Sequence, residues 1–314
     1  MKMFASFLPV PTGAAAPMRK AGIVAFVSEV LYEARLALSG LSLARKTPRN
    51  GLPERSGQGA IALVGAGPGA RDLLTLRAAE RLQQADIIFY DRLVDPELLD
   101  LARPDAEQIY VGKSVGVCAW PQERIDAVIV AAALEGKQVV RLKSGDPGMF
   151  GRATEELAAA RANGISVEIV PGVTAASAAG AALGRSLTER GATDRVVFAT
   201  GMCRAGDDTP DWGASTSPGT TLALYMGVRQ APVIEANLLA AGVPAGSGVE
   251  IVSDISTDRQ RIARCRLDAL AETIIREEIG NPAIILIRYD KAAVRLGGGT
   301  EMENGRTAPL VVSC

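Results

Sequence analysis

Residues 60–72 read A-I-A-L-V-G-A-G-P-G-A-R-D, an aliphatic run followed by a glycine-rich loop and then an acidic residue. The aliphatic run predicts a buried strand, and Asp72 is placed to open a helix. Glycines between a strand and a helix let the backbone turn tightly and approach a ligand closely. This stretch therefore predicts an α/β unit with a ligand-binding loop at the carboxyl end of its strand.

Short aliphatic runs alternate with Ala/Leu/Glu-rich stretches beyond this point, which is typical of a mainly parallel sheet covered by helices. We expect strands at Ala60–Val64, Ile87–Tyr90, Val139–Leu142, Val167–Val170, Val196–Ala199, Thr221–Tyr225, Val249–Val252 and Ala283–Ile287. We expect helices at Asp72–Gln84, Gln122–Glu135, Thr154–Asn163, Val228–Ala241 and Leu267–Glu278.

A Pro171-Gly172 break, followed by the small-residue run Thr174–Ala182, predicts two α/β lobes joined near this point. The predicted division is a basic arm and linker over residues 1–58, an N-terminal lobe over 59–172, a C-terminal lobe over 173–296 and a tail over 297–314.

Composition excludes several classes of mechanism. The 314 residues contain no His, which rules out Ser-His and Cys-His nucleophile pairs, a His general base and His-ligated zinc. The four cysteines form no C-x-x-C motif, so we expect free thiols in a reducing cytoplasm and no metal site. A formal net charge of -1 predicts no general attraction to nucleic acid or to an anionic membrane. The sequence also lacks the roughly 18 successive apolar residues of a membrane-spanning helix.

The N-terminal arm has its own composition, with eight basic and three acidic side chains in residues 1–55. Ile23–Leu43 could form one amphipathic helix, and Thr47–Gly59 has the Pro/Gly/Arg-rich character of a linker. Three interpretations stay open: a flexible or docked tail, a targeting segment, and a misplaced start codon. No motif in the arm indicates chemistry.

The glycine loop satisfies the dinucleotide-binding pattern G-x-G-x-x-A over residues 65–70. On that interpretation Asp91, after the second predicted strand, would bind a ribose. Pro68 argues against a pyrophosphate site because it has no backbone N–H to offer a phosphate. A plain tight turn is the simplest alternative.

Three further motifs follow predicted strands. Residues 141–152 read R-L-K-S-G-D-P-G-M-F-G-R, residues 170–177 read V-P-G-V-T-A-A-S, and residues 225–227 read Y-M-G. Ligands of open α/β sheets bind beyond the carboxyl ends of strands, so these loops are candidate binding loops. In the simpler interpretation of the first, Asp146 only caps the next helix.

In order along the chain, G-A-G-P-G, D-L-L-T-L, F-Y-D-R-L-V, V-G-K, P-Q-E and these three motifs resemble the tetrapyrrole methyltransferases, most closely the uroporphyrinogen-III C-methyltransferases. The resemblance runs from about Ala60 to Ile287. It implies a two-lobe α/β fold with mainly parallel sheets, S-adenosylmethionine in the cleft between the lobes and a homodimer. It also implies methylation of uroporphyrinogen III to precorrin-2 through precorrin-1, for sirohaem or cobalamin, without a metal.

The resemblance also implies roles for individual residues. Asp91 corresponds to the family's proposed proton acceptor and Lys113 to its proposed proton donor. The cofactor contacts would be Pro68, Ser144, Gly145, Asp146, Met149, Thr174, Ala175 and Met226. Because Arg forms bidentate pairs with carboxylates, and Lys can pair with them as a point charge, the candidate partners of the substrate's carboxylates are Arg92, Arg141, Lys143 and Arg152. The simpler interpretation makes Asp91-Arg92 a surface ion pair and Lys113 a solvated lysine.

Some positions depart from the family pattern: Ala70, the G-V-C-A-W of residues 116–120, Glu189 and Ile255. Alternatives therefore remain: a methyltransferase of the same fold acting on a later precorrin, an NAD-dependent oxidoreductase, and a non-catalytic binding protein. The arm lacks the nucleotide-binding pattern of the dehydrogenase/ferrochelatase module that is fused to some members, so we expect methylation only.

Overall fold

The computed structural model describes residues 59–112, 120–202 and 209–292, which form two five-stranded sheets. The strands are β1 (Ala60–Gly65), β2 (Ile87–Tyr90), β3 (Glu107–Tyr110), β4 (Gln138–Lys143), β5 (Ser166–Val170), β6 (Arg195–Thr200), β7 (Thr220–Tyr225), β8 (Gly248–Ser253), β9 (Arg261–Arg266) and β10 (Ala283–Tyr289). The α-helices are α2 (Leu76–Gln84), α3 (Gln122–Leu134), α4 (Ala153–Ala162), α5 (Ala175–Ala182), α6 (Ala231–Ala240) and α7 (Leu270–Arg276). Short 3-10 helices are η1 (Arg71–Leu73), η2 (Pro96–Leu101), η3 (Val228–Gln230) and η4 (Leu267–Ala269).

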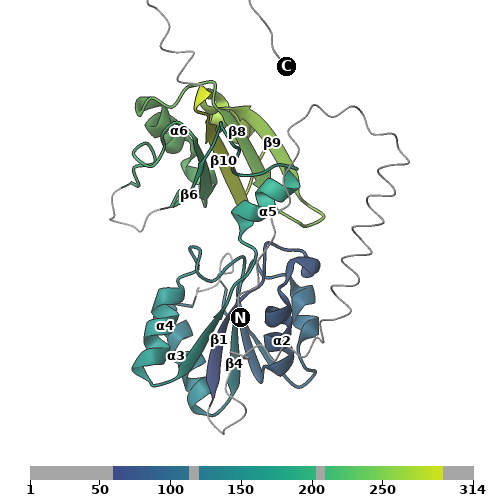
Figure 1. Cartoon of the computed structure of the whole chain (residues 1–314). Helices are drawn as coiled ribbons and strands as arrows, with labels where there is room; N and C mark the ends of the chain where they lie inside the picture. Colours follow the sequence, from purple (N-terminus) through teal and green to yellow (C-terminus); the bar gives the residue numbers. More distant parts are fainter. Residues whose placement is uncertain (1–58, 113–119, 203–208, 293–314) are drawn as a thin grey trace, which may run out of the picture. The chain divides into compact units, whose positions relative to one another are not determined.

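The first sheet has the order β3-β2-β4-β1-β5, and each neighbouring pair is parallel. Helices α3 and α4 cover one face and α2 covers the other (Figure 1). The residues of β1 alternate between these faces: Ile61 and Leu63 pack with α3 and α4, whereas Ala62 and Val64 pack with α2. Around β1 both faces are lined with apolar residues, which explains the unbroken aliphatic run in the sequence.

The second sheet has the order β6-β7-β10-β8-β9. Only β6 and β7 are parallel; β10 pairs antiparallel with β7 and β8, and β8 pairs antiparallel with β9. The prediction of mainly parallel sheets therefore holds for the first sheet, while the second is mixed. The short segment between β8 and β9 suits antiparallel pairing, since parallel neighbours need a longer crossover.

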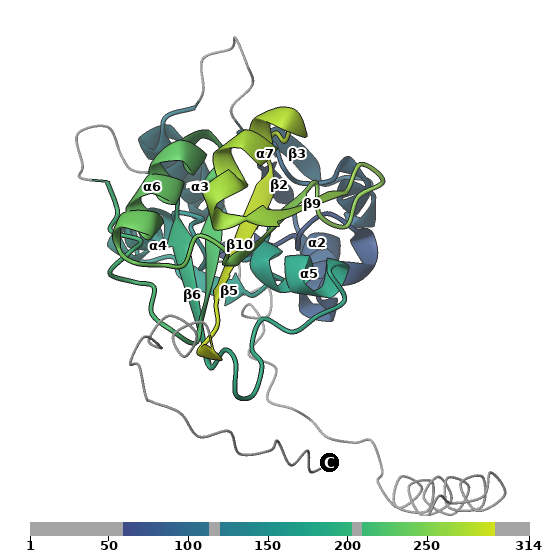
Figure 2. The same ribbon diagram turned by 90° about the horizontal axis from the view of Figure 1, so that it is seen from above.

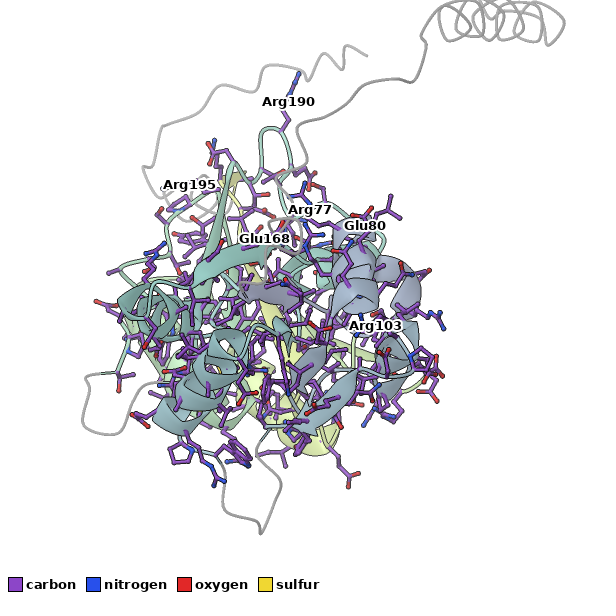
Figure 3. All side chains as sticks on the ribbon, turned by 90° about the horizontal axis from the view of Figure 1, so that it is seen from below. Arg77, Glu80, Arg103, Glu168, Arg190 and Arg195 are labelled. Carbon is purple, nitrogen blue, oxygen red and sulfur yellow. The ribbon has the colours of Figure 1, made fainter. Side chains whose placement is uncertain are left out.

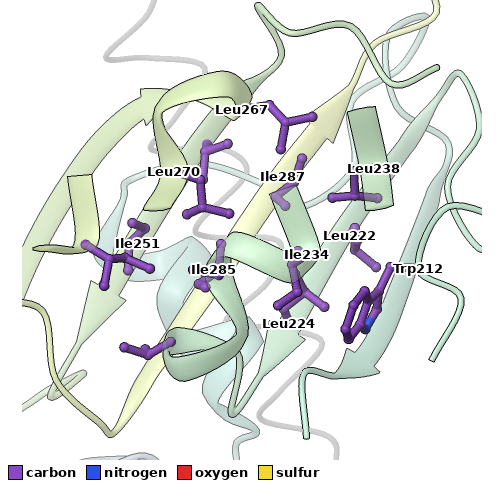
Figure 4. Packing of buried hydrophobic residues seen from close by; sticks show 14 of the residues in the cluster. Trp212, Leu222, Leu224, Ile234, Leu238, Ile251, Leu267, Leu270, Ile285 and Ile287 are labelled. Carbon is purple, nitrogen blue, oxygen red and sulfur yellow. The ribbon is translucent and has the colours of Figure 1, made fainter. Parts of the chain in front are cut away.

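The core of the second sheet is apolar and well packed. Trp212, Leu222, Leu238 and their neighbours fill one face beneath α6 and α7 (Figure 4). In Figure 2 these two helices lie across the strands of this sheet. The small helix α5 packs on the other face through Ala176 and Ala179.

All eight predicted strands are confirmed, with Ile87–Tyr90 at its predicted bounds. The predicted helix Asp72–Gln84 is divided: η1 covers Arg71–Leu73, and α2 starts at Leu76 after Thr75, whose Oγ1 accepts a hydrogen bond from the Ala78 N–H. The sequence did not predict β3, β9 or α5. In the described part of the chain, no helix is long and apolar enough to cross a membrane.

Candidate functional site

In the first sheet, the connections that follow β1 and β4 pass over opposite faces. From β1 the chain passes through α2 on one face, and from β4 it passes through α4 on the other. β1 and β4 are neighbours, so this is the topological switch point where open α/β sheets bind ligands. We call the side of the sheet where all five strands end the carboxyl edge. The loop of residues 65–70 and the loop of residues 144–151 both lie there.

The backbones of three loops come into close contact at glycines: the loop after β1, the loop after β4 and the loop of residues 171–174 after β5. A Cβ on Gly65 would lie 2.6 Å from the Gly172 nitrogen and 2.7 Å from the Gly145 oxygen, and a Cβ on Gly172 would lie 2.2 Å from that same oxygen. Gly67 and Gly145 exchange two backbone hydrogen bonds, of 3.2 and 2.7 Å. The glycines of three separate motifs are therefore needed for one close contact between loops.

Asp146 connects two of these loops. Its Oδ1 accepts from the Gly148 N–H at 2.7 Å, and its Oδ2 accepts from the Gly172 N–H at 3.0 Å. Gly145 has φ +68°, and a Cβ there would contact no protein atom within 4 Å. Asp146 therefore holds this loop on one side, and the space beside the Cα of Gly145 is open on the other.

The predicted cofactor residues near these loops differ in exposure. Gly145 is buried, whereas Pro68, Ser144, Asp146 and Met149 are half-buried. The Met149 N–H donates to the Asp146 oxygen at 3.1 Å, which closes the turn.

The predicted contacts of the C-terminal lobe gather around Tyr225. Its hydroxyl hydrogen-bonds Thr174 Oγ1 at 2.6 Å and accepts from the Ala176 N–H at 3.2 Å, so it holds the start of α5. Phe150, from the loop after β4, packs on the Tyr225 ring with centroids 4.9 Å apart. Met226 follows directly, exposed and with φ +57°.

Left-handed backbone marks the same loops. Among the described non-glycine residues, those with positive φ are Phe150, Arg152, Met226, Asp254, Ser256 and Glu278. All except Glu278 follow the carboxyl ends of β4, β7 or β8. Such strain costs roughly 1–3 kcal/mol per residue and clusters at functional sites. Ser256 Oγ also accepts from the Ala70 N–H at 3.0 Å, which joins the loop after β8 to the loop after β1.

Four charged side chains form a buried charge network at the carboxyl edge: Asp91, Arg141, Lys143 and Glu156. Arg141 donates from Nη2 to Asp91 Oδ1 at 2.5 Å and from Nε to Glu156 Oε1 at 2.9 Å. Lys143 Nζ lies 2.8 Å from both oxygens of Glu156. Burial, and then the neighbouring charge of Arg141, lower the pKa of Lys143 below its usual range.

The candidate substrate cations fall into two groups. Arg92 and Arg152 are exposed, and Arg152 pairs with Glu155 at 2.9 Å. This hydrogen bond from Arg152 lowers the pKa of Glu155. Arg141 and Lys143 are 2% and 4% exposed and already paired within the protein. Lys113 lies outside the described residues, so its role as proton donor stays a prediction.

Glu189, one of the positions that depart from the family pattern, forms an ion pair with Arg288. Its carboxylate lies 2.9 Å from Arg288 Nη2, and a backbone bridge to Thr193 forms a short turn. Arg190 projects from the tip of this turn, away from the ribbon (Figure 3).

The dinucleotide interpretation fits this geometry poorly. It needs the acidic residue on the strand beside the glycine loop, whereas β4 lies between β1 and β2.

Sequence reasoning missed Glu156, whose side chain is 0% exposed. The available signal was its position between Ala153 and Ala160, the other buried residues of α4, on the face of the helix that packs on the sheet. Among the described residues, no group of three or more His, Cys, Asp or Glu could hold a metal ion.

The sequence and the fold are also similar to those of known proteins. Residues 60–271 match the family model of the tetrapyrrole (corrin/porphyrin) methylases. A sirohaem synthase of Tolumonas auensis is 45% identical over 229 residues, which are 73% of this chain and 48% of that protein. The chain thus spans about half the length of the curated relatives it matches.

Solved structures extend the similarity. A uroporphyrin-III C-methyltransferase from Thermus thermophilus, in complex with S-adenosylhomocysteine, is 36% identical with a TM-score of 0.63, over 76% of this chain and 99% of that one. A cobalt-precorrin-4 methyltransferase is 28% identical with a TM-score of 0.65, over 76% of this chain and 98% of that one. The family model covers well over half of the sequence, and the chain therefore belongs to the tetrapyrrole methylase family.

Proposed function

We propose that this chain transfers the methyl group of S-adenosylmethionine to carbons of uroporphyrinogen III, forming precorrin-2 through precorrin-1. The observation that carries the proposal is the match to nearly the whole of the Thermus thermophilus uroporphyrin-III C-methyltransferase. The glycine loop of residues 65–70 and the motifs of residues 141–152, 170–177 and 225–227 lie around the β1/β4 switch point and Tyr225.

The chemistry needs little from the protein beyond alignment and the removal of one proton. An electron-rich pyrrole carbon attacks the sulfonium methyl, the new C–C bond forms, and the C–S electrons stay on sulfur as S-adenosylhomocysteine. The pyrrole system then loses a proton to a base. Asp91 is our candidate for that base, since it is the part of the buried charge network that reaches solvent, with its side chain 32% exposed.

For the cofactor, we propose contacts with the two groups of loop residues named above. Pro68, Ser144, Gly145, Asp146 and Met149 belong to the first group. Thr174, Ala175 and Met226 belong to the second. The open space beside the Cα of Gly145 and the strained, exposed Met226 support this assignment.

For the substrate carboxylates, the exposed Arg92 and Arg152 are the better candidates. Arg141 and Lys143 would have to leave buried carboxylate partners, which is costly for a charge in the interior. We further propose a cytoplasmic homodimer whose methyl transfer needs no metal. Light scattering of the purified chain measures its oligomeric state.

The test is methyl transfer by the purified chain, with labelled S-adenosylmethionine and uroporphyrinogen III. Two successive transfers per substrate molecule are expected. The similarity to a cobalt-precorrin-4 methyltransferase favours a second candidate, an enzyme of a later precorrin, so that substrate is tested in parallel. Transfer to the later substrate alone would replace the proposed activity, and transfer to neither would refute it.

A further inference from the structure

Glu156 is a buried carboxylate that the proposed reaction does not use directly. It lies in the first turn of α4, on the buried face that also carries Ala153 and Ala160. Its side chain is 0% exposed. A carboxylate in such a place must be paired to stay charged, because burial of an unpaired charge is strongly unfavourable.

The partners of Glu156 come from one strand. Arg141 and Lys143 are two residues apart on β4, so both side chains leave the same face of the sheet, the face that α3 and α4 cover. Both cations are buried, and both donate to Glu156. One carboxylate therefore holds two cations at the carboxyl end of β4.

Arg141 connects Glu156 to Asp91, because its guanidinium donates to both carboxylates. Nε faces Glu156, Nη1 donates to the backbone oxygens of Phe89 at 3.4 Å and Leu142 at 3.2 Å, and Nη2 donates to Asp91. A planar guanidinium held at Nε and Nη1 has no freedom to turn, so the direction in which Nη2 points is fixed. Asp91 is 32% exposed, whereas the other three side chains are at most 5% exposed.

The balance of charges also indicates that Glu156 keeps Arg141 paired with Asp91. The buried charge network contains two cations and two carboxylates, so its formal charge is zero. Without the charge of Glu156, two buried cations would face Asp91 alone, and Lys143 would compete with Arg141 for it. A buried ion pair is weak evidence of stability, because apolar residues of similar volume often stabilise a core as well.

We propose that Glu156 is a positioning residue for Asp91: it holds Arg141 through Nε, so that Nη2 orients the carboxylate that accepts the proton. The inference rests on the proposed function, in which Asp91 is the base. Glu156 itself touches neither substrate nor cofactor.

The test is a double-mutant cycle on kcat with Glu156→Gln and Asp91→Asn, at a temperature where all variants are folded. Glu156→Gln should lower kcat by about tenfold, a part of the 10²–10⁴ that a general base supplies. Affinity for S-adenosylhomocysteine should stay within about twofold, because the residue acts on the base and not on the cofactor loops. In the Asp91→Asn background, Glu156→Gln should cause no further loss, since there is no base left to orient.

Glu168→Gln is the matched control. Glu168 pairs with the buried Arg81 at 2.6 Å on the α2 face of the same sheet, so its loss removes a comparable ion pair without touching Asp91. Its kcat should equal that of the wild type. Should Glu156→Gln fail to fold, Glu156→Gln/Lys143→Met takes its place in the cycle, because Arg141 and Asp91 then remain as a neutral pair.

Wild-type kcat for Glu156→Gln, or an equal loss of kcat in both backgrounds, would overturn the inference. Turnover of the wild-type chain in the same series reports the proposed function separately. A wild-type rate for Asp91→Asn would refute the base itself.

Discussion

The two sheets have the same number of strands but differ in where their strands end. All five strands of the first sheet are parallel, so five loops share its carboxyl edge. In the second sheet β6, β7 and β8 run one way and β9 and β10 the other, so only three strands end together. A parallel sheet gathers chemistry-bearing loops, whereas the mixed sheet contributes fewer of them and a large apolar core.

The difference extends to the side chains near the carboxyl ends. In the first sheet, β4 ends in buried cations that pair with Glu156 and Asp91. In the second, the face beneath α6 and α7 consists of apolar residues around Trp212 and Leu238. We therefore expect changes in the first sheet to alter binding and rate, and changes in the core of the second to alter stability.

The largest expected effect is at Gly145. Gly145→Val should abolish binding of S-adenosylhomocysteine in calorimetry, because a branched side chain would fill the approach to the loop. Gly164→Val is the control: Gly164 also has φ +68° with no protein atom near a Cβ, but it lies in the turn between α4 and β5. Both variants carry the same backbone strain at positive φ. Equal affinity in the two folded variants would contradict the proposed cofactor site.

The second prediction concerns the core of the second sheet. Leu238 is fully buried on α6, and Leu238→Ala should lower the free energy of unfolding by about 3–5 kcal/mol, the usual cost of a buried leucine. Denaturant unfolding measures the loss. Affinity for S-adenosylhomocysteine in the folded variant should stay at the wild-type value. A large fall in affinity would contradict the assignment of binding to the first sheet and of stability to the core of the second.

The third prediction isolates Asp91. Asp91→Asn keeps the shape and most of the hydrogen bonding, and it should lower kcat by on the order of 10², the low end for a general base. Binding of S-adenosylhomocysteine should barely change. The oxidoreductase alternative requires the reverse, namely lost nucleotide affinity with the chemistry preserved.

The smallest expected effect is that of the N-terminal arm. Deletion of residues 1–55 should leave methyl transfer intact, because every motif lies after Ala60. A fall in turnover beyond about tenfold, or roughly 1.4 kcal/mol, would show that the two sheets are not sufficient for the reaction.

The sequence predicts the elements better than it predicts their contacts. Aliphatic strands such as Ile87–Tyr90 are identified correctly, whereas β3 reads E-Q-I-Y and β9 carries three exposed arginines, so neither has the pattern of a buried strand. The glycine loops are evident as motifs. Their mutual contact at Gly65, Gly145 and Gly172 depends on strand order, which local patterns do not contain. Glu156 was missed because the face that α4 buries is set by its packing on the sheet.

The most direct test of the account is the position of bound S-adenosylhomocysteine in a crystal of the complex. The account predicts the ligand at the β1/β4 switch point, with its polar groups against the backbone of residues 144–146 and its sulfur directed towards the side of Asp91. A ligand that binds away from these loops and makes no contact with the backbone of Gly145 would contradict the account.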